Sequence, residues 1–146
     1  MTINNHSILA ALLFFSIFFN SSCTDNYQKG SSAKEYFNKA YQFIDAGYPQ
    51  DAIELLNLAI EKDPKYIDAY YNRGVLYFTL KNYQQAITNF SKVIELNPKH
   101  AEAYFNRGHM YERLNNYPQA ISDYKTAAIL GDKVAQDYLK TKGITW

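Results

Sequence analysis

The sequence predicts an all-α solenoid of three helix-turn-helix units followed by a C-terminal capping helix. The first observation is an internal repeat: the segment 70–98 nearly recurs when it is shifted forward by 34 residues, and a looser copy precedes it. The second is the spacing of Tyr70, Gly74 and Tyr77, which places the three on one face of a helix. A fixed period of this length is typical of stacked units that bury their apolar faces against one another.

The repeat divides the C-terminal part of the chain into consecutive units. Three repeats and a capping helix with a tail are expected at residues 33–66, 67–100, 101–131 and 132–146. Each repeat should hold two antiparallel helices, and Pro49 suits the first turn of a second helix. Pro64 and Pro98 should close the first two units, because the residue before Pro disfavours helix.

Small residues stand where the two helices of a unit must approach closely. Gly74 and Gly108 fall inside predicted helices, although Gly is less favourable there than Ala by about 1 kcal/mol. We expect them to allow close helix contact, and Ala40 holds the same place in the first unit. The residues expected on the inner face of the second helices are Ala52, Leu56, Ala59, Ala86, Phe90, Val93, Ala120, Tyr124 and Ala127.

The segment 132–142 reads as a helix that covers the open end of the last repeat, since each repeat buries its core only against its neighbours. Its apolar residues are expected to face the repeats: Val134, Ala135, Tyr138 and Leu139. In the tail, Ile144 and Trp146 are expected to fold back onto this helix.

The pattern over about 33–132 resembles the tetratricopeptide repeat, a 34-residue helix-turn-helix unit with fixed aromatic, Gly, Ala and Pro positions. Lys39, Arg73 and Arg107 stand where the family usually has Leu, and Asp132 replaces the Pro of the third unit. We expect the three basic residues to cover the helices with their aliphatic stems rather than to bind anions.

The N-terminal residues 1–22 contain no Asp, Glu, Lys or Arg. An apolar run over 8–19 is shorter than the roughly 20 residues of a membrane-spanning helix and matches the core of a secretory signal. Ser22 precedes Cys23, the only cysteine, so the segment resembles a bacterial lipoprotein signal. Asn20 departs from the usual Leu, and the N-terminal region lacks Lys and Arg.

The lipoprotein resemblance implies cleavage before Cys23 and attachment of acyl chains such as palmitate to that residue. Residues 23–32 would then be a flexible tether that holds the domain at a membrane. The expected location is the extracytoplasmic side of the cell envelope. The alternatives are secretion after a cut near Ser22 and an uncleaved anchor.

Composition and motifs argue against catalysis and nucleic-acid binding. Lys and Arg number 15 against 14 Asp and Glu, a balance that gives none of the basic excess of nucleic-acid binders. His6, His100 and His109 are separated in the sequence and predict no metal cluster. His100 is expected to be solvated, and Glu112 to be an ordinary surface residue. We therefore expect no enzyme, catalytic residue, metal, cofactor or small-molecule substrate.

In tetratricopeptide arrays the first helices line a concave groove, so the resemblance implies a binding site for a protein or peptide. The groove residues carried over are Phe37, Asn38, Tyr41, Tyr71, Asn72, Phe78, Phe105, Asn106 and His109. Further groove positions hold Lys34, Asp45, Asp68, Val75, Thr79, Glu102, Glu112 and Arg113. Their Asn residues recur every 34 positions, and amides offer both a donor and an acceptor to a peptide backbone. The alternative is that the Asn residues are inherited scaffold and the aromatic residues are packing.

Some tetratricopeptide domains hold the C-terminal carboxylate of heat-shock chaperones with basic and amide side chains. At those positions this chain has Phe37, Tyr41, Asn72, Glu102 and Asn106, and Glu102 would repel a carboxylate. The expected function is thus a non-catalytic protein-interaction module with some other partner. The alternative is a structural subunit of an envelope complex that uses its convex face or its ends.

Overall fold

The computed structural model describes residues 31–146, so the predicted signal peptide and Cys23 lie outside the described residues. Seven α-helices and no strands occur in the part that is described. They are α2 (Ala33–Asp45), α3 (Pro49–Lys62), α4 (Ile67–Thr79), α5 (Tyr83–Leu96), α6 (Ala101–Arg113), α7 (Tyr117–Ile129) and α8 (Lys133–Thr141). The all-α solenoid prediction is confirmed.

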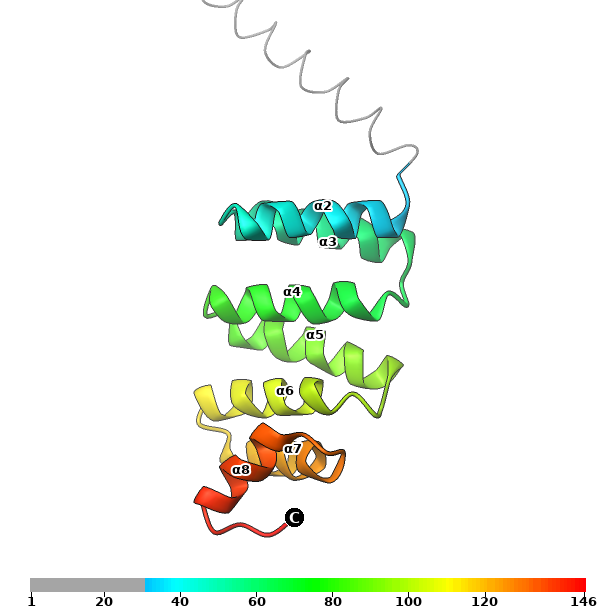
Figure 1. Ribbon diagram of the computed structural model, residues 1–146. Coiled ribbons are helices and arrows are strands. Elements are labelled where there is room, and N and C mark those ends of the chain that lie inside the picture. Colours follow the sequence, from blue (N-terminus) through cyan, green and yellow to red (C-terminus); the bar gives the residue numbers. More distant parts are fainter. Residues whose placement is uncertain (1–30) are drawn as a thin grey trace, which may run out of the picture. The chain divides into compact units, whose positions relative to one another are not determined.

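The helices pack as three antiparallel pairs, α2 with α3, α4 with α5 and α6 with α7, stacked in chain order (Figure 1). Neighbouring pairs meet where α3 contacts α4 and where α5 contacts α6, and α8 packs against α7. None of the helices within residues 31–146 has the length and apolar character needed to cross a membrane.

The turns inside the three repeats share one backbone conformation. Gly47, Lys81 and Asn115 stand at equivalent positions after the first helix of each repeat, with φ of 80°, 59° and 60°. Left-handed backbone suits Gly and is tolerated by Asn, whereas Lys adopts it at some cost in energy. The repeat therefore imposes the same turn even where the side chain disfavours it.

The close contact predicted at the two glycines is present. A Cβ atom built on Gly74 would lie 2.9 Å from Cε1 of Phe90. One built on Gly108 would lie 3.0 Å from Cδ1 of Tyr124 and 3.1 Å from the backbone oxygen of Ala120. All the residues predicted for the inner faces of the second helices are buried, with exposures of 2% or less.

The two arginines make contacts that the sequence prediction did not include. Arg107 donates through Nε and Nη2 to both carboxylate oxygens of Asp123 at 2.8 Å, and through Nη1 to Ser91 Oγ at 3.0 Å. Arg73 donates to Asn89 Oδ1 at 2.7 Å and to Asn57 Oδ1 at 2.6 Å. Each guanidinium thus joins the second helix of its own repeat to that of the preceding repeat. Their role is more than coverage by aliphatic stems.

The C-terminal helix caps the stack with only part of the predicted apolar set. Asp132 begins α8 by accepting a hydrogen bond from the Ala135 amide at 2.8 Å, and Leu139 is fully buried. Ile144 packs against the same cluster, as predicted. The prediction for Val134 was wrong, because it lies on the outer side of α8 and is 60% exposed. Trp146 is 47% exposed.

We predict that Gly108→Ala destabilises the protein. The added methyl group would press on a buried ring and a backbone carbonyl, and such overpacking costs about 1–3 kcal/mol. The better helix propensity of Ala returns only about 1 kcal/mol. Thermal unfolding followed by circular dichroism should therefore show a lower melting temperature. Ser122→Ala, on the exposed side of α7, is the control; equal melting temperatures for all three proteins would contradict the prediction.

Candidate binding face on the first helices

Side chains bridge from each first helix to the next on one face of the stack. The hydroxyl of Tyr41 on α2 donates to Asn72 Oδ1 on α4 at 3.1 Å. The amide of Asn106 on α6 donates to the hydroxyl of Tyr71 on α4 at 2.9 Å. We call this surface the first-helix face, defined by the predicted groove residues on α2, α4 and α6 together with Glu112 and Arg113.

The three Asn residues of this face differ in their surroundings. Asn72 donates to the backbone oxygen of Asp68 at 2.8 Å and also accepts the bond from Tyr41. Asn106 is partly buried and linked to Tyr71. Asn38 is exposed and makes no hydrogen bond with any described residue. Two of the amides therefore join neighbouring repeats, and Asn38 presents its amide to solvent.

Most of the aromatic residues of the face also pack against other rings. The nearest ring centroids lie 4.9 Å apart for Phe37 and Tyr66, and 5.5 Å apart for Phe105 and Tyr124. Phe78 lies 5.3 Å from the His109 imidazole. Tyr41 differs from these half-buried residues because it is 42% exposed. Its ring offers the face an aromatic surface that a partner can reach.

His100 is not solvated as the sequence suggested. Its Nδ1 accepts a hydrogen bond from the Ala103 amide at 3.2 Å, so the side chain caps the start of α6. The imidazole also stacks on the Tyr71 ring at 5.3 Å. Histidine is not among the residues preferred directly before a helix, so the sequence carried no clear signal of this role.

Glu112 also departs from the prediction of an ordinary surface residue. Its carboxylate accepts hydrogen bonds from the hydroxyls of Tyr124 at 2.8 Å and Tyr138 at 2.6 Å. Burial acts to raise the pKa of Glu112, but the two hydroxyls outweigh it and leave that pKa below its ordinary value. Burial and the nearby carboxylate raise the pKa of Tyr138 to about 12. Three helices, α6, α7 and α8, therefore meet at this carboxylate.

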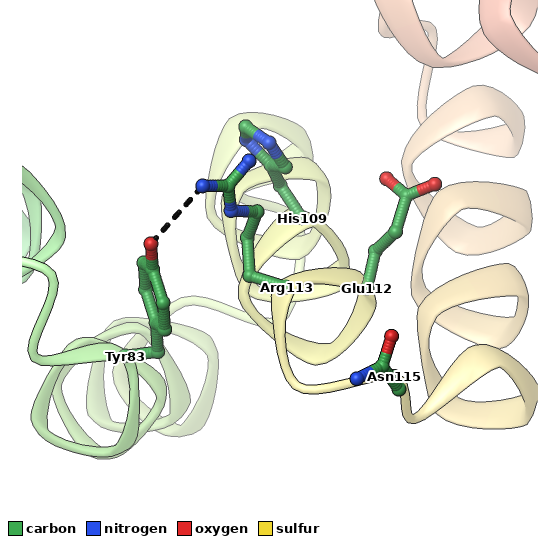
Figure 2. A pocket seen from close by; sticks show the side chains of 5 residues that line it. All are labelled: Tyr83, His109, Glu112, Arg113 and Asn115. Atoms are coloured by element: carbon green, nitrogen blue, oxygen red, sulfur yellow. Dashed lines mark hydrogen bonds between the residues drawn. The ribbon is translucent and has the colours of Figure 1, made fainter.

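A pocket of about 370 Å³ opens at the α6 end of the face. It is lined by Tyr83, His109, Glu112, Arg113 and Asn115 (Figure 2). Arg113 donates from Nη2 to the Tyr83 hydroxyl at 3.2 Å, and its guanidinium lies 5.6 Å from the centroid of that ring. The structure thus brings together three residues that the sequence placed in the groove.

The lining of this pocket offers hydrogen-bond donors and acceptors together with both signs of charge. It combines a cation, a carboxylate, an imidazole and an amide, and it includes no Ser, Thr or Cys nucleophile. Among residues 31–146 no group of three His, Cys, Asp or Glu residues could hold a metal ion. Asn115 reaches the pocket from the left-handed turn after α6, which the sequence did not predict.

The repeats match three family models of the tetratricopeptide repeat. Two models described as tetratricopeptide repeat cover residues 67–100 and 89–122, and one described as TPR repeat covers residues 40–81. Together the three matches extend from residue 40 to residue 122. No match was found among curated protein sequences.

Solved structures of similar fold include several tetratricopeptide proteins. The MamA protein is 30% identical with a TM-score of 0.66, over 72% of this chain and 57% of MamA, so this chain spans little more than half of MamA. The first TPR domain of Spaghetti (RPAP3), bound to the HSP90 peptide SRMEEVD, is 24% identical with a TM-score of 0.70, over 75% of this chain and 89% of that domain. YrrB, a TPR protein with an unusual peptide-binding site, is 20% identical with a TM-score of 0.69, over 77% of this chain and 59% of YrrB.

We predict that Glu112→Gln lowers the melting temperature by more at pH 7 than at pH 3. The pKa of Glu112 is depressed in the fold, so its charged form contributes stability above the unfolded value of about 4.3, and this contribution is lost as the pH falls through the folded pKa. The wild-type and variant curves should therefore converge in acid. Glu54→Gln on the exposed side of α3 is the control. A melting difference of equal size at both pH values would contradict the assignment.

Proposed function

Because the chain belongs to the tetratricopeptide repeat family, with matches over residues 40–122, we propose that it is a non-catalytic module that binds a protein or peptide on its first-helix face. The observation that carries the proposal is the pocket on that face, where His109, Glu112 and Arg113 come together. Domains of this family are generally interaction modules. Two structures of similar fold, the first and second TPR domains of Spaghetti, hold a peptide.

Binding would use a surface that is already formed. The bonds from Tyr41 to Asn72 and from Asn106 to Tyr71 connect the three first helices before any partner arrives. A preformed surface lowers the ordering cost of association, which otherwise offsets much of the contact energy. The exposed ring of Tyr41 and the free amide of Asn38 would contact the partner at one end of the face, and the pocket would take a side chain at the other.

The charges of the face favour a partner other than a chaperone C-terminus. The bound peptide in the Spaghetti structures is acidic at its end, but this chain has Phe37 and Glu102 at two positions where chaperone-binding domains have basic side chains. In the pocket, Arg113 and Glu112 carry opposite charges. We propose a peptide segment that offers both a donor and an acceptor to this pair.

We further propose that the domain is exported and held at a membrane through acyl chains on Cys23. The support is the uncharged segment 1–22 with its apolar run, and the single cysteine that follows it. The tether 23–32 would separate the lipid from α2, so that the first-helix face could bind an extracytoplasmic partner. Secretion without a lipid is the alternative.

A second candidate function is that of a structural subunit in an envelope complex. The observation that favours it is the exposed apolar surface at the α7–α8 end, where Ile129 is 70% exposed and Val134 is 60% exposed. In this role the end of the stack would carry the main contact, and the first-helix face would not.

We predict that His109→Ala combined with Arg113→Gln weakens partner binding at least about tenfold, since the loss of a central contact commonly costs more than 1.4 kcal/mol. Proteins recovered with tagged full-length protein from detergent-solubilised envelope would be identified by mass spectrometry, and their recovery compared across variants. Lys62→Gln on α3 is the matched control and should retain the partner.

Melting temperatures would confirm that the pocket variant keeps its fold. If the pocket variant recovers as much partner as the wild-type protein does, the assignment of the binding face is wrong. Loss of the partner on changing Ile129 and Val134 to Ser would then support the structural role.

We predict that Cys23→Ala abolishes acylation and moves the protein from the membrane to the soluble fraction. Intact-mass analysis of wild-type protein should show a chain that begins at Cys23 and carries acyl chains, because the thiol is the attachment point of a lipoprotein signal. The Cys23→Ala chain should lack that mass. Unchanged processing and membrane partitioning in this variant would refute lipid anchoring.

A further inference from the structure

Two arginines occupy equivalent places in consecutive repeats, but their partners differ in charge. Arg107 forms a bidentate ion pair with Asp123, with both hydrogen bonds at 2.8 Å. At the position 34 residues earlier than Asp123 the chain has Asn89, and Arg73 donates to its amide oxygen at 2.7 Å. Among the described residues no carboxylate forms an ion pair with Arg73. The charge of Arg73 is therefore not neutralised by its partner, whereas the charge of Arg107 is neutralised by Asp123.

Arg73 also has hydrogen-bond donors that no described residue uses. Its Nε donates to Asn89 and its Nη1 donates to Asn57. The Nη2 atom, whose counterpart in Arg107 donates to Asp123, makes no hydrogen bond with residues 31–146. No fully buried side-chain nitrogen or oxygen in this range lacks a hydrogen-bond partner, so Nη2 is reachable by solvent. Asn89 fills the Nε side of the guanidinium, and an anion can approach Nη2 from the solvent.

A cavity of about 310 Å³ lies beside this guanidinium. It is lined by Tyr70, Arg73, Thr88, Asn89, Ser91, Lys92 and Glu95, none of which belongs to the first-helix face. Lys92 forms an ion pair with Glu95 at 2.6 Å, so the charges of those two residues cancel. The lining therefore has one net positive charge, that of Arg73. Burial lowers the pKa of Arg73, whereas the bond to Asp123 raises that of Arg107, in agreement with this difference in pairing.

The chemistry of the lining favours a singly charged planar anion. A charged guanidinium forms strong hydrogen bonds with carboxylate oxygens, and Nη2 of Arg73 has donors left for one. The Ser91 and Tyr70 hydroxyls add neutral hydrogen-bonding groups. A phosphate dianion would be repelled by the Glu95 carboxylate more strongly than a monoanion.

We propose that the cavity beside Arg73 binds a carboxylate group, which accepts a hydrogen bond from Nη2 of Arg73 and balances the charge that the neutral Asn89 leaves unpaired. The ligand group is that of an acidic side chain on a protein or of a small free carboxylate. This site is separate from the proposed peptide face and does not depend on it.

The test is a titration of the purified full-length protein with sodium acetate, at constant ionic strength maintained with sodium chloride. Nitrogen-15 NMR of the arginine Nε–H groups and of the Asn89 side-chain amide would follow binding. The Arg73 and Asn89 signals should shift and saturate, and the Arg107 signal should not move. A titration with N-acetylglutamic acid amide distinguishes the sources: saturation at lower concentration than acetate indicates an acidic side chain, and equal or weaker binding indicates a small free carboxylate.

Two reciprocal variants sharpen the test. Asn89→Asp supplies an internal carboxylate and should abolish the acetate-dependent shift at Arg73. Asp123→Asn removes the carboxylate from the third repeat and should make Arg107 respond to acetate. If wild-type Arg73 shows no saturable response to acetate, or responds to phosphate and not to acetate, the proposal is overturned. That result stands even if a variant fails to fold, because it is measured on the wild-type protein.

Discussion

The architecture depends on a close contact between a small residue on each first helix and a large side chain on the second. At Gly74 and Gly108 there is no room for a methyl group, because the rings of Phe90 and Tyr124 already fill the space. This contact sets the separation of the two helices within a pair. Repeating it at a fixed period stacks the pairs in register, so the first helices share one face and the second helices share another.

The same contact also supports the candidate binding face. Tyr124 packs its ring against Gly108 and donates its hydroxyl to Glu112, whose carboxylate also holds Tyr138 of the capping helix. One wall of the pocket is therefore fixed by the core of the third repeat and by the cap. A site supported in this way can recognise a partner without reorganising, and it ties the integrity of the face to the C-terminal helix.

The fold could be predicted from the sequence because the repeat period and the helical spacing are local patterns that every unit shares. Much of the site could not, because its contacts join residues that differ between repeats. Nothing in the local sequence around Glu112 indicates that Tyr138, 26 residues away, will reach it. The exposure of Val134 depends on the rotation of α8, which apolar composition alone does not set. The capping bond of His100 also appears only in the structure, because His is not among the residues preferred directly before a helix.

Binding of a partner to the first helices is tested most directly by hydrogen–deuterium exchange on the complex. The protein would be compared with and without the partner that co-purifies with it. Slower exchange is expected at backbone amides of α2, α4 and α6 and at the turn that contains Asn115, with α3, α5 and α7 unchanged. Protection that falls instead on α7 and α8, or on the second helices, would contradict it.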